Sequence, residues 1–215
     1  MLKMSATIAL LGCVLMAMSP ASGQAPEIAW KSLFDGKTLD GWKATNFGGE
    51  GEVHVKDGAV VMEIGNDMTG VTYARKDFPK VDYEVTLEGK RLKGNDFFCT
   101  TTFPINDTFC SLVMGGWGGG VVGLSSINAR DASENETGSL LSFKDNQWYR
   151  VRIRVRKDRI QAWVDDKNVV DIEVKDKKIY TRPECDLSQP FGVATWRTTG
   201  AVRGIRVRRL DPKER

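Results

Sequence analysis

The sequence has few of the features that define helical, zinc-stabilised or membrane-spanning proteins. Its 215 residues include one histidine and four cysteines, and the cysteine spacing matches no zinc-binding pattern. Outside the extreme N-terminus, no segment shows the apolar period of an amphipathic helix. No later apolar run approaches the roughly 20 residues of a membrane-spanning helix. These absences argue against a helical fold, a zinc site and stable membrane insertion, and they leave strands as the main elements.

The first 23 residues differ in composition from the rest of the chain. Lys3 supplies a positive charge, an apolar run extends from Ile8 to Met18, and small residues fill positions 19–23. This order is typical of a secretory signal peptide cleaved after Gly23. We therefore expect a secreted or periplasmic protein with a short tether at residues 24–29. Lipidation at Cys13 is the alternative, although this cysteine lies inside the apolar run and not at its end.

Residues 148–171 carry the clearest pattern, because apolar and polar residues alternate there with a period of two. The apolar positions of the first strand are Tyr149, Val151, Ile153 and Val155. The polar positions between and after them are Arg150, Arg152, Arg154 and Arg156. Turns at residues 157–158 and 166–168 are too short for a crossover helix, so the three strands must run antiparallel. A meander with one apolar face needs a second layer, and the scarcity of helical patterns predicts that this layer is another sheet.

Other segments of the chain also have the composition and alternation of strands. They are residues 53–55, 59–64, 71–75, 81–87, 97–103, 109–114, 191–196 and 201–210. In residues 81–87 the alternation points Tyr83, Val85 and Leu87 inward. The sequence thus predicts one all-β domain at residues 30–211, built as a sandwich of two antiparallel sheets, with a tail at residues 212–215.

Three cysteines remain after the predicted signal peptide: Cys99, Cys110 and Cys185. Cys99 and Cys110 flank a hairpin that we expect to turn at residues 104–107, so a disulfide could join them across the strands. Buried free thiols are the alternative.

A glycine-rich segment at residues 115–120 surrounds Trp117. Glycine loses more conformational freedom than other residues on folding, so this composition indicates a backbone that needs unusual geometry. Trp117 either offers an apolar plate to a sugar ring or packs as a lid on the sandwich. The next polar segment, residues 125–137, is predicted to be a surface loop. Its oxygen-bearing side chains Asp131, Glu134, Asn135 and Glu136 are the one candidate for a calcium site, and a solvated loop without metal is the alternative.

Five segments together resemble the 3-keto-disaccharide hydrolase family, whose fold is similar to the concanavalin and laminin-G jelly rolls. They are Ser32 to Trp42 (SLFDGKTLDGW), Val55 to Gly58 (VKDG), Asp82 to Val85 (DYEV), the meander from Trp148, and Arg203 to Arg208 (RGIRVR). They span almost the whole mature chain. The segment around residues 88–97 differs from the family pattern. Within it, Glu88 and Asn95 keep the residue types of the family, and Lys90 keeps the positive charge.

The resemblance implies an enzyme that cleaves a glycoside already oxidised at C3. The ketone acidifies the C2 proton, so a base can remove it, the aglycone leaves by elimination, and water then adds. The family match makes Glu88 the candidate base, with Lys90 and Asn95 as orienting or enolate-stabilising groups. His54 is an alternative base near neutral pH. The remaining candidate substrate contacts are Trp117, Asp96 and Arg75.

Several alternatives stay open from the residues alone. Glu84 shares a strand face with Glu88, and such carboxylates are often simply solvated surface. A glycosidase with two carboxylates, a non-catalytic carbohydrate-binding module and a structural domain also fit the pattern. The arginines of residues 150–156, with Arg206 and Arg208, could bind anionic glycans unless acidic neighbours neutralise them. No nucleic-acid recognition motif is present.

Overall fold

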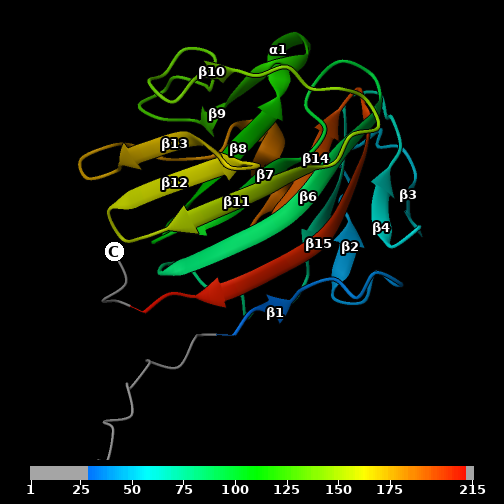
Figure 1. Ribbon diagram of the computed structural model, residues 1–215, viewed down its shortest axis with the longest axis horizontal. Coiled ribbons are helices and arrows are strands. Elements are labelled where there is room, and N and C mark those ends of the chain that lie inside the picture. The colour runs from blue at the N-terminus through cyan, green and yellow to red at the C-terminus, as the bar shows by residue number, and fades with distance from the viewer. Residues whose placement is uncertain (1–28, 212–215) are drawn as a thin grey trace, which may run out of the picture.

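The computed structural model describes residues 29–211, which fold into two antiparallel sheets stacked face to face (Figure 1). The predicted all-β sandwich is therefore confirmed. The predicted signal peptide, most of the tether and the C-terminal tail lie outside the described residues. Within residues 29–211, no helix is long and apolar enough to span a membrane.

The first sheet, called sheet A, has eight strands. In spatial order they are β13 (Lys167–Glu173), β12 (Arg159–Val164), β11 (Tyr149–Val155), β6 (Tyr83–Lys93), β15 (Thr199–Arg209), β4 (Ala59–Met62) and β3 (Val53–Lys56), with β1 (Lys31–Ser32) also pairing with β15. The predicted meander is the run β11, β12 and β13. Figure 1 shows these strands beside β6, whose Val85 pairs with Ile153 of β11.

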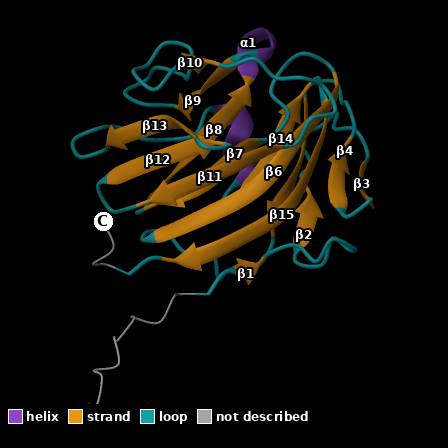
Figure 2. Cartoon of the chain, in the orientation of Figure 1, coloured by secondary structure: helices purple, strands orange, loops and turns teal. Residues whose placement is uncertain are grey.

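The second sheet, sheet B, has seven strands. In spatial order they are β10 (Ser139–Leu140), β9 (Val121–Ser125), β8 (Thr108–Gly115), β7 (Thr100–Ile105), β14 (Gly192–Trp196), β5 (Met68–Tyr73) and β2 (Trp42–Ala44). Two short helical segments complete the fold, α1 (Gly116–Gly119) and the 3₁₀ helix η1 (Pro183–Ser188) (Figure 2). The helical period could not reveal either one, since each is at most two turns long.

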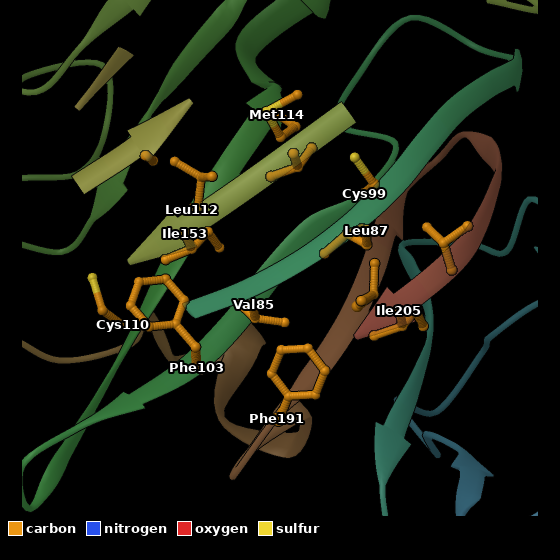
Figure 3. Close-up of a cluster of buried hydrophobic side chains, with 14 of the residues drawn as sticks. Val85, Leu87, Cys99, Phe103, Cys110, Leu112, Met114, Ile153, Phe191 and Ile205 are labelled. Carbon is orange, nitrogen blue, oxygen red and sulfur yellow. The ribbon is translucent and has the colours of Figure 1, made fainter. Parts of the chain in front are cut away.

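Apolar side chains from both sheets fill the space between them. Figure 3 shows Val85 and Leu87 of β6 together with Phe103 and Leu112 of sheet B, and all four are almost completely buried. The inward direction predicted for Tyr83, Val85 and Leu87 is confirmed. Burial of such side chains contributes about 1.5–3 kcal/mol each relative to exposure, so this core dominates the stability of the sandwich.

Two local predictions are wrong. The β7–β8 hairpin turns at Asn106 and Asp107, while Pro104 lies inside β7 and pairs with Phe109. Residues 125–137 are not simply a surface loop, because Ile127, Ala132 and Asn135 are buried. The Asn135 amide donates to the carbonyl oxygens of Leu124 and Asp131, both at 2.7 Å. These bonds satisfy buried backbone groups and hold the segment against β9.

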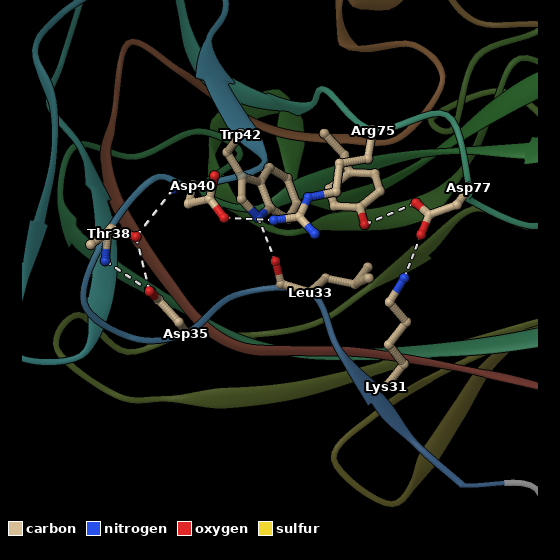
Figure 4. A network of polar contacts seen from close by, with 9 residues as sticks. Lys31, Leu33, Asp35, Thr38, Asp40, Trp42, Arg75 and Asp77 are labelled. Atoms are coloured by element: carbon tan, nitrogen blue, oxygen red, sulfur yellow. Dashed lines mark hydrogen bonds and ion pairs between the residues drawn. The ribbon is translucent and has the colours of Figure 1, made fainter.

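The N-terminal motif at residues 32–42 packs into the core through Leu33, Phe34 and Trp42. Figure 4 shows Trp42 donating its indole N–H to the carbonyl of Leu33 at 2.8 Å. Arg75 lies in the same network, where its guanidinium contacts the Asp40 carboxylate at 2.6 Å. The structure therefore places this predicted substrate contact in a surface ion pair.

Candidate functional site

A cleft of about 230 Å³ lies on the outer face of sheet B. Its floor comes from strand positions that alternate with core positions. Ser111, for example, lies between the core residues Cys110 and Leu112, and it pairs with Thr102 and Ser125 on the neighbouring strands. The lining residues are Asp96, Phe97, Thr100, Ser111, Val113, Trp117, Ser125, Arg182, Glu184, Cys185 and Trp196.

Trp117 reaches the cleft from the tight turn α1 between β8 and β9. Its backbone is left-handed, with φ 49° and ψ 55°, and its side chain is 43% exposed. Gly115 precedes the turn at φ 80°, a conformation that favours glycine, and a Cβ there would make a tight contact of 3.1 Å with the Phe98 ring. The glycine-rich composition is thus explained by a turn that presents an indole at the cleft edge.

Asp96 supports this turn from the β6–β7 connection. One carboxylate oxygen accepts the backbone N–H of Phe97 at 2.7 Å, and the other accepts that of Gly118 at 3.3 Å. Asn95 contributes its carbonyl, which lies against Gly119. Of the predicted contacts, Trp117 and Asp96 therefore meet at one end of the cleft, whereas Asn95 lies beside the turn and is not part of the cleft lining.

Arg182 and Glu184 face the cleft from the start of η1, where Pro183 fixes the backbone at the first helical position. The Arg182 guanidinium contacts the Glu184 carboxylate through Nε at 2.5 Å and the Asp131 carboxylate through Nη1 at 3.0 Å. Its carbon centre lies 5.7 Å from the Trp117 ring centroid. Within residues 29–211, Nη2 of Arg182 and the second oxygen of Glu184 have no hydrogen-bond partner. A guanidinium and a carboxylate therefore share the cleft, each with a polar atom available to a ligand.

The floor beside this pair is apolar. Met68, Cys185 and Ala194 form a small buried cluster, and Phe97 and Trp196 pack against it. Trp196 also stands between this cleft and a second cavity of about 320 Å³, which Phe47, Asn66 and Leu187 help to line. Aromatic rings next to polar groups are typical of carbohydrate sites, because a sugar has an apolar face and a polar rim.

Two floor hydroxyls lack partners. The Thr100 and Ser125 side chains are almost completely buried, and neither hydroxyl has a hydrogen-bond partner in the described structure. An unsatisfied buried hydroxyl costs about 1–3 kcal/mol. A ligand hydroxyl that reached either group would recover part of this cost.

The predicted catalytic residues lie on the opposite side of the molecule, on the outer face of sheet A. Glu88 forms an ion pair with Arg203 at 2.7 Å, and the Lys90 ammonium lies 4.5 Å from the Trp148 ring centroid. His54 shares this face but is three strand spacings from Lys90, or about 14 Å. Since stacked sheets are about 10 Å apart, these residues cannot act in the sheet B cleft.

The Glu84 side chain is not exposed to solvent, so the interpretation of the carboxylates on this strand face as solvated surface is wrong for Glu84. Its side chain is 3% exposed and contacts three guanidiniums: Arg154 at 2.8 Å, Arg208 at 3.6 Å and Arg152 at 3.8 Å. The predicted neutralisation of the arginines by acidic neighbours is thus present at this position. Such pairing makes Glu84 a structural anion and a poor candidate for a base.

The four calcium candidates do not converge. Asp131 pairs with Arg182, Asn135 bonds to backbone carbonyls, and Glu136 pairs with Lys177 at 2.7 Å. Across residues 29–211, no three His, Cys, Asp or Glu side chains are grouped as a metal site would require.

Cys99, Cys110 and Cys185 are free and buried. Burial raises the pKa of the Cys110 and Cys185 thiols to about 12 and that of Cys99 also well above its ordinary value. Cys185 borders the cleft, but a protonated thiol is a weak nucleophile.

We therefore expect a thiol-reactive disulfide reagent to label none of the three cysteines within minutes near neutral pH. The test uses protein that begins at residue 24, so that Cys13 is absent. Release of the reagent chromophore measures how many thiols are labelled. The same reagent should label all three after denaturation. Rapid labelling of Cys185 in the native protein would contradict the buried, protonated state.

Arg182, Glu184 and Trp196 were not identified from the sequence. Trp196 carried a usable signal, because alternation with Val193 and Thr195 places it on the outer face, where a large aromatic residue is unusual. Arg182 and Glu184 lie in a short irregular segment with no periodic pattern. They reach the cleft only because η1 packs on sheet B.

Residues 29–208 match the family model described as a 3-keto-alpha-glucoside-1,2-lyase-like domain. No curated protein matches the sequence.

Several solved structures share the fold at low identity. The transglycosylase Crh5 in complex with NAG aligns with a TM-score of 0.58 and 13% identity, covering 86% of this chain and 84% of its own. A glycosyl hydrolase candidate from Parabacteroides distasonis gives 0.51 and 11%, covering 85% and 94%. The carbohydrate-binding module CBM66 from Bacillus subtilis gives 0.50 and 13%, covering 78% and 95%. At these identities the likeness supports the jelly-roll fold alone.

The family model covers nearly all of the described residues, and the sandwich it implies is the one observed. The chain therefore belongs to the family of 3-keto-alpha-glucoside-1,2-lyase-like domains.

Proposed function

We propose that this protein binds carbohydrate in the sheet B cleft and cleaves 3-keto-glucosides there by elimination. One observation carries the proposal: Arg182 and Glu184 face the same cleft beside Trp117, each with a polar atom that has no partner within residues 29–211. Family membership and the carbohydrate-related names of the structural neighbours support it.

The reaction needs one base and one donor for the enolate oxygen. In our proposal Glu184 removes the proton from C2, electrons move toward the C3 carbonyl, and Arg182 stabilises the charge that develops on that oxygen. The enolate then reforms the C3 carbonyl as the C1–C2 double bond forms and the C1–O bond breaks, and the leaving alkoxide takes the proton that Glu184 had removed. Water adds to the unsaturated sugar in a separate step.

The cleft fits this chemistry better than an ordinary glycosidase mechanism. A glycosidase needs two carboxylates that both act at the scissile bond. Asp96 is the other carboxylate that lines the main cleft, and both of its oxygens already accept backbone N–H groups. A single available carboxylate beside a guanidinium suits an elimination.

The test is to incubate the protein with a 3-keto disaccharide and with its unoxidised parent, while following the release of free sugar. We expect cleavage of the keto form alone. Trp117→Ala should weaken sugar binding about tenfold, because one exposed ring contributes on the order of 1–2 kcal/mol. Saturable sugar binding with no product from either substrate would instead identify a carbohydrate-binding module. The absence of both sugar binding and cleavage would overturn the proposal.

A further inference from the structure

The outer face of sheet A carries a dense group of arginines beside tryptophans, on the opposite side of the sandwich from the cleft. Arg152 lies 3.8 Å from the Trp163 ring centroid, and Arg206 lies 5.7 Å from that of Trp30. Both arginines point outward, since they alternate with the buried residues of β11 and β15. Figure 1 shows β11, β6 and β15 side by side across this face.

Strand register aligns two of these arginines on either side of one hydroxyl. Arg206 of β15 pairs with Thr86 of β6, and Thr86 pairs in turn with Arg152 of β11. Neighbouring strands lie about 4.8 Å apart, so the two arginine backbones are about 10 Å apart. Two arginine side chains that start at that separation are long enough to meet at a common anion above Thr86.

These three residues also have hydrogen-bonding capacity that the described part of the structure leaves unused. Arg206 forms no ion pair within residues 29–211, and Arg152 reaches a carboxylate only at 3.8 Å, on a Glu84 that Arg154 and Arg208 also contact. The Thr86 hydroxyl is buried and has no hydrogen-bond partner in the described structure. An anion at this position would accept bonds from both guanidiniums and the hydroxyl.

We propose that Arg152, Thr86 and Arg206 bind the carboxylate or sulfate groups of an acidic polysaccharide. The choice of a polysaccharide rests on the carbohydrate function proposed above. A flat sheet flanked by the half-buried rings of Trp30 and Trp163 suits an extended sugar chain, and it lacks the projecting helix or ribbon with which many proteins read nucleic acid. This surface would hold the protein on its polymer while the cleft processes a sugar.

The proposal is tested by measuring binding of the protein to polygalacturonate, dextran sulfate and uncharged dextran. We expect binding to at least one acidic polymer and none to uncharged dextran. Arg206→Gln should weaken binding about tenfold, as expected for the loss of one charge-assisted contact. Thr86→Val should also weaken it while keeping the shape of the side chain. Lys43→Gln, an equal charge loss on the exposed part of β2, is the matched control and should leave binding unchanged.

Three outcomes would overturn the proposal. They are no binding to either acidic polymer, equal losses in Arg206→Gln and Lys43→Gln, and tighter binding to duplex DNA or anionic vesicles than to both polymers. The relative affinities for polygalacturonate and dextran sulfate identify the anionic group. Glu184→Gln should bind the acidic polymer like the wild type, so failure of this proposal and failure of the cleft chemistry give different results.

Discussion

Glu184→Gln should lower the rate of 3-keto-glucoside cleavage by at least about 100-fold, the usual contribution of a positioned general base. The amide has nearly the shape of the carboxylate but cannot accept the C2 proton. Sugar binding should change little, because Trp117 and the floor hydroxyls are untouched. The measurement is kcat and KM on the 3-keto disaccharide, together with equilibrium binding of the unoxidised sugar.

Two control variants make the result specific. Glu134→Gln removes an exposed carboxylate outside the cleft lining and should match the wild type. Glu88→Gln separates the two candidate sites, because Glu88 lies on the outer face of sheet A. Loss of activity in Glu88→Gln with full activity in Glu184→Gln would move the chemistry to that face and contradict the proposed function.

The strands were predictable because their signal is local. In β6 and β11 the inward and outward positions alternate without interruption, so the residues that enter the core can be identified within each strand alone, whereas the pairing of Val85 with Ile153 appears only in the structure. The alternation depends only on neighbours in the chain.

The cleft could not be predicted because its members come from four distant segments. Asp96 lies between β6 and β7, Trp117 between β8 and β9, and Trp196 ends β14. Arg182 and Glu184 join them only because η1 packs on the outer face of sheet B through Cys185. No spacing in the sequence encodes that contact.

Glu84 and Glu88 illustrate the same limit within a single strand. The sequence gives both the same outward direction, but register places Glu84 between Arg154 and Arg208 and Glu88 between Arg150 and Arg203. Glu84 is buried there, whereas the Glu88 side chain is 38% exposed. Equal patterns therefore produced a buried structural anion and a surface ion pair.

This difference predicts a large effect on stability. Glu84→Gln should lower the free energy of unfolding by about 3–5 kcal/mol, because it removes a buried negative charge that contacts three guanidiniums. Gln still fits the space and can accept a bond from Arg154, so the loss reports charge and not volume. For a domain of this size we expect a fall in Tm of roughly 6–20 °C, measured by thermal and urea unfolding.

Glu88→Gln is the matched control, since it makes the same chemical change two residues along the same strand face. Its pair with Arg203 is more than a third exposed, so solvent screening should limit the loss to about 0–1 kcal/mol. Added salt should recover part of the stability of Glu84→Gln, because anions screen the repulsion among Arg152, Arg154 and Arg208. If the free energies of unfolding of Glu84→Gln and Glu88→Gln were within about 1 kcal/mol of each other, the buried charge of Glu84 would not be what holds the arginines of this face together, and counterions or hydration would have to offset their repulsion.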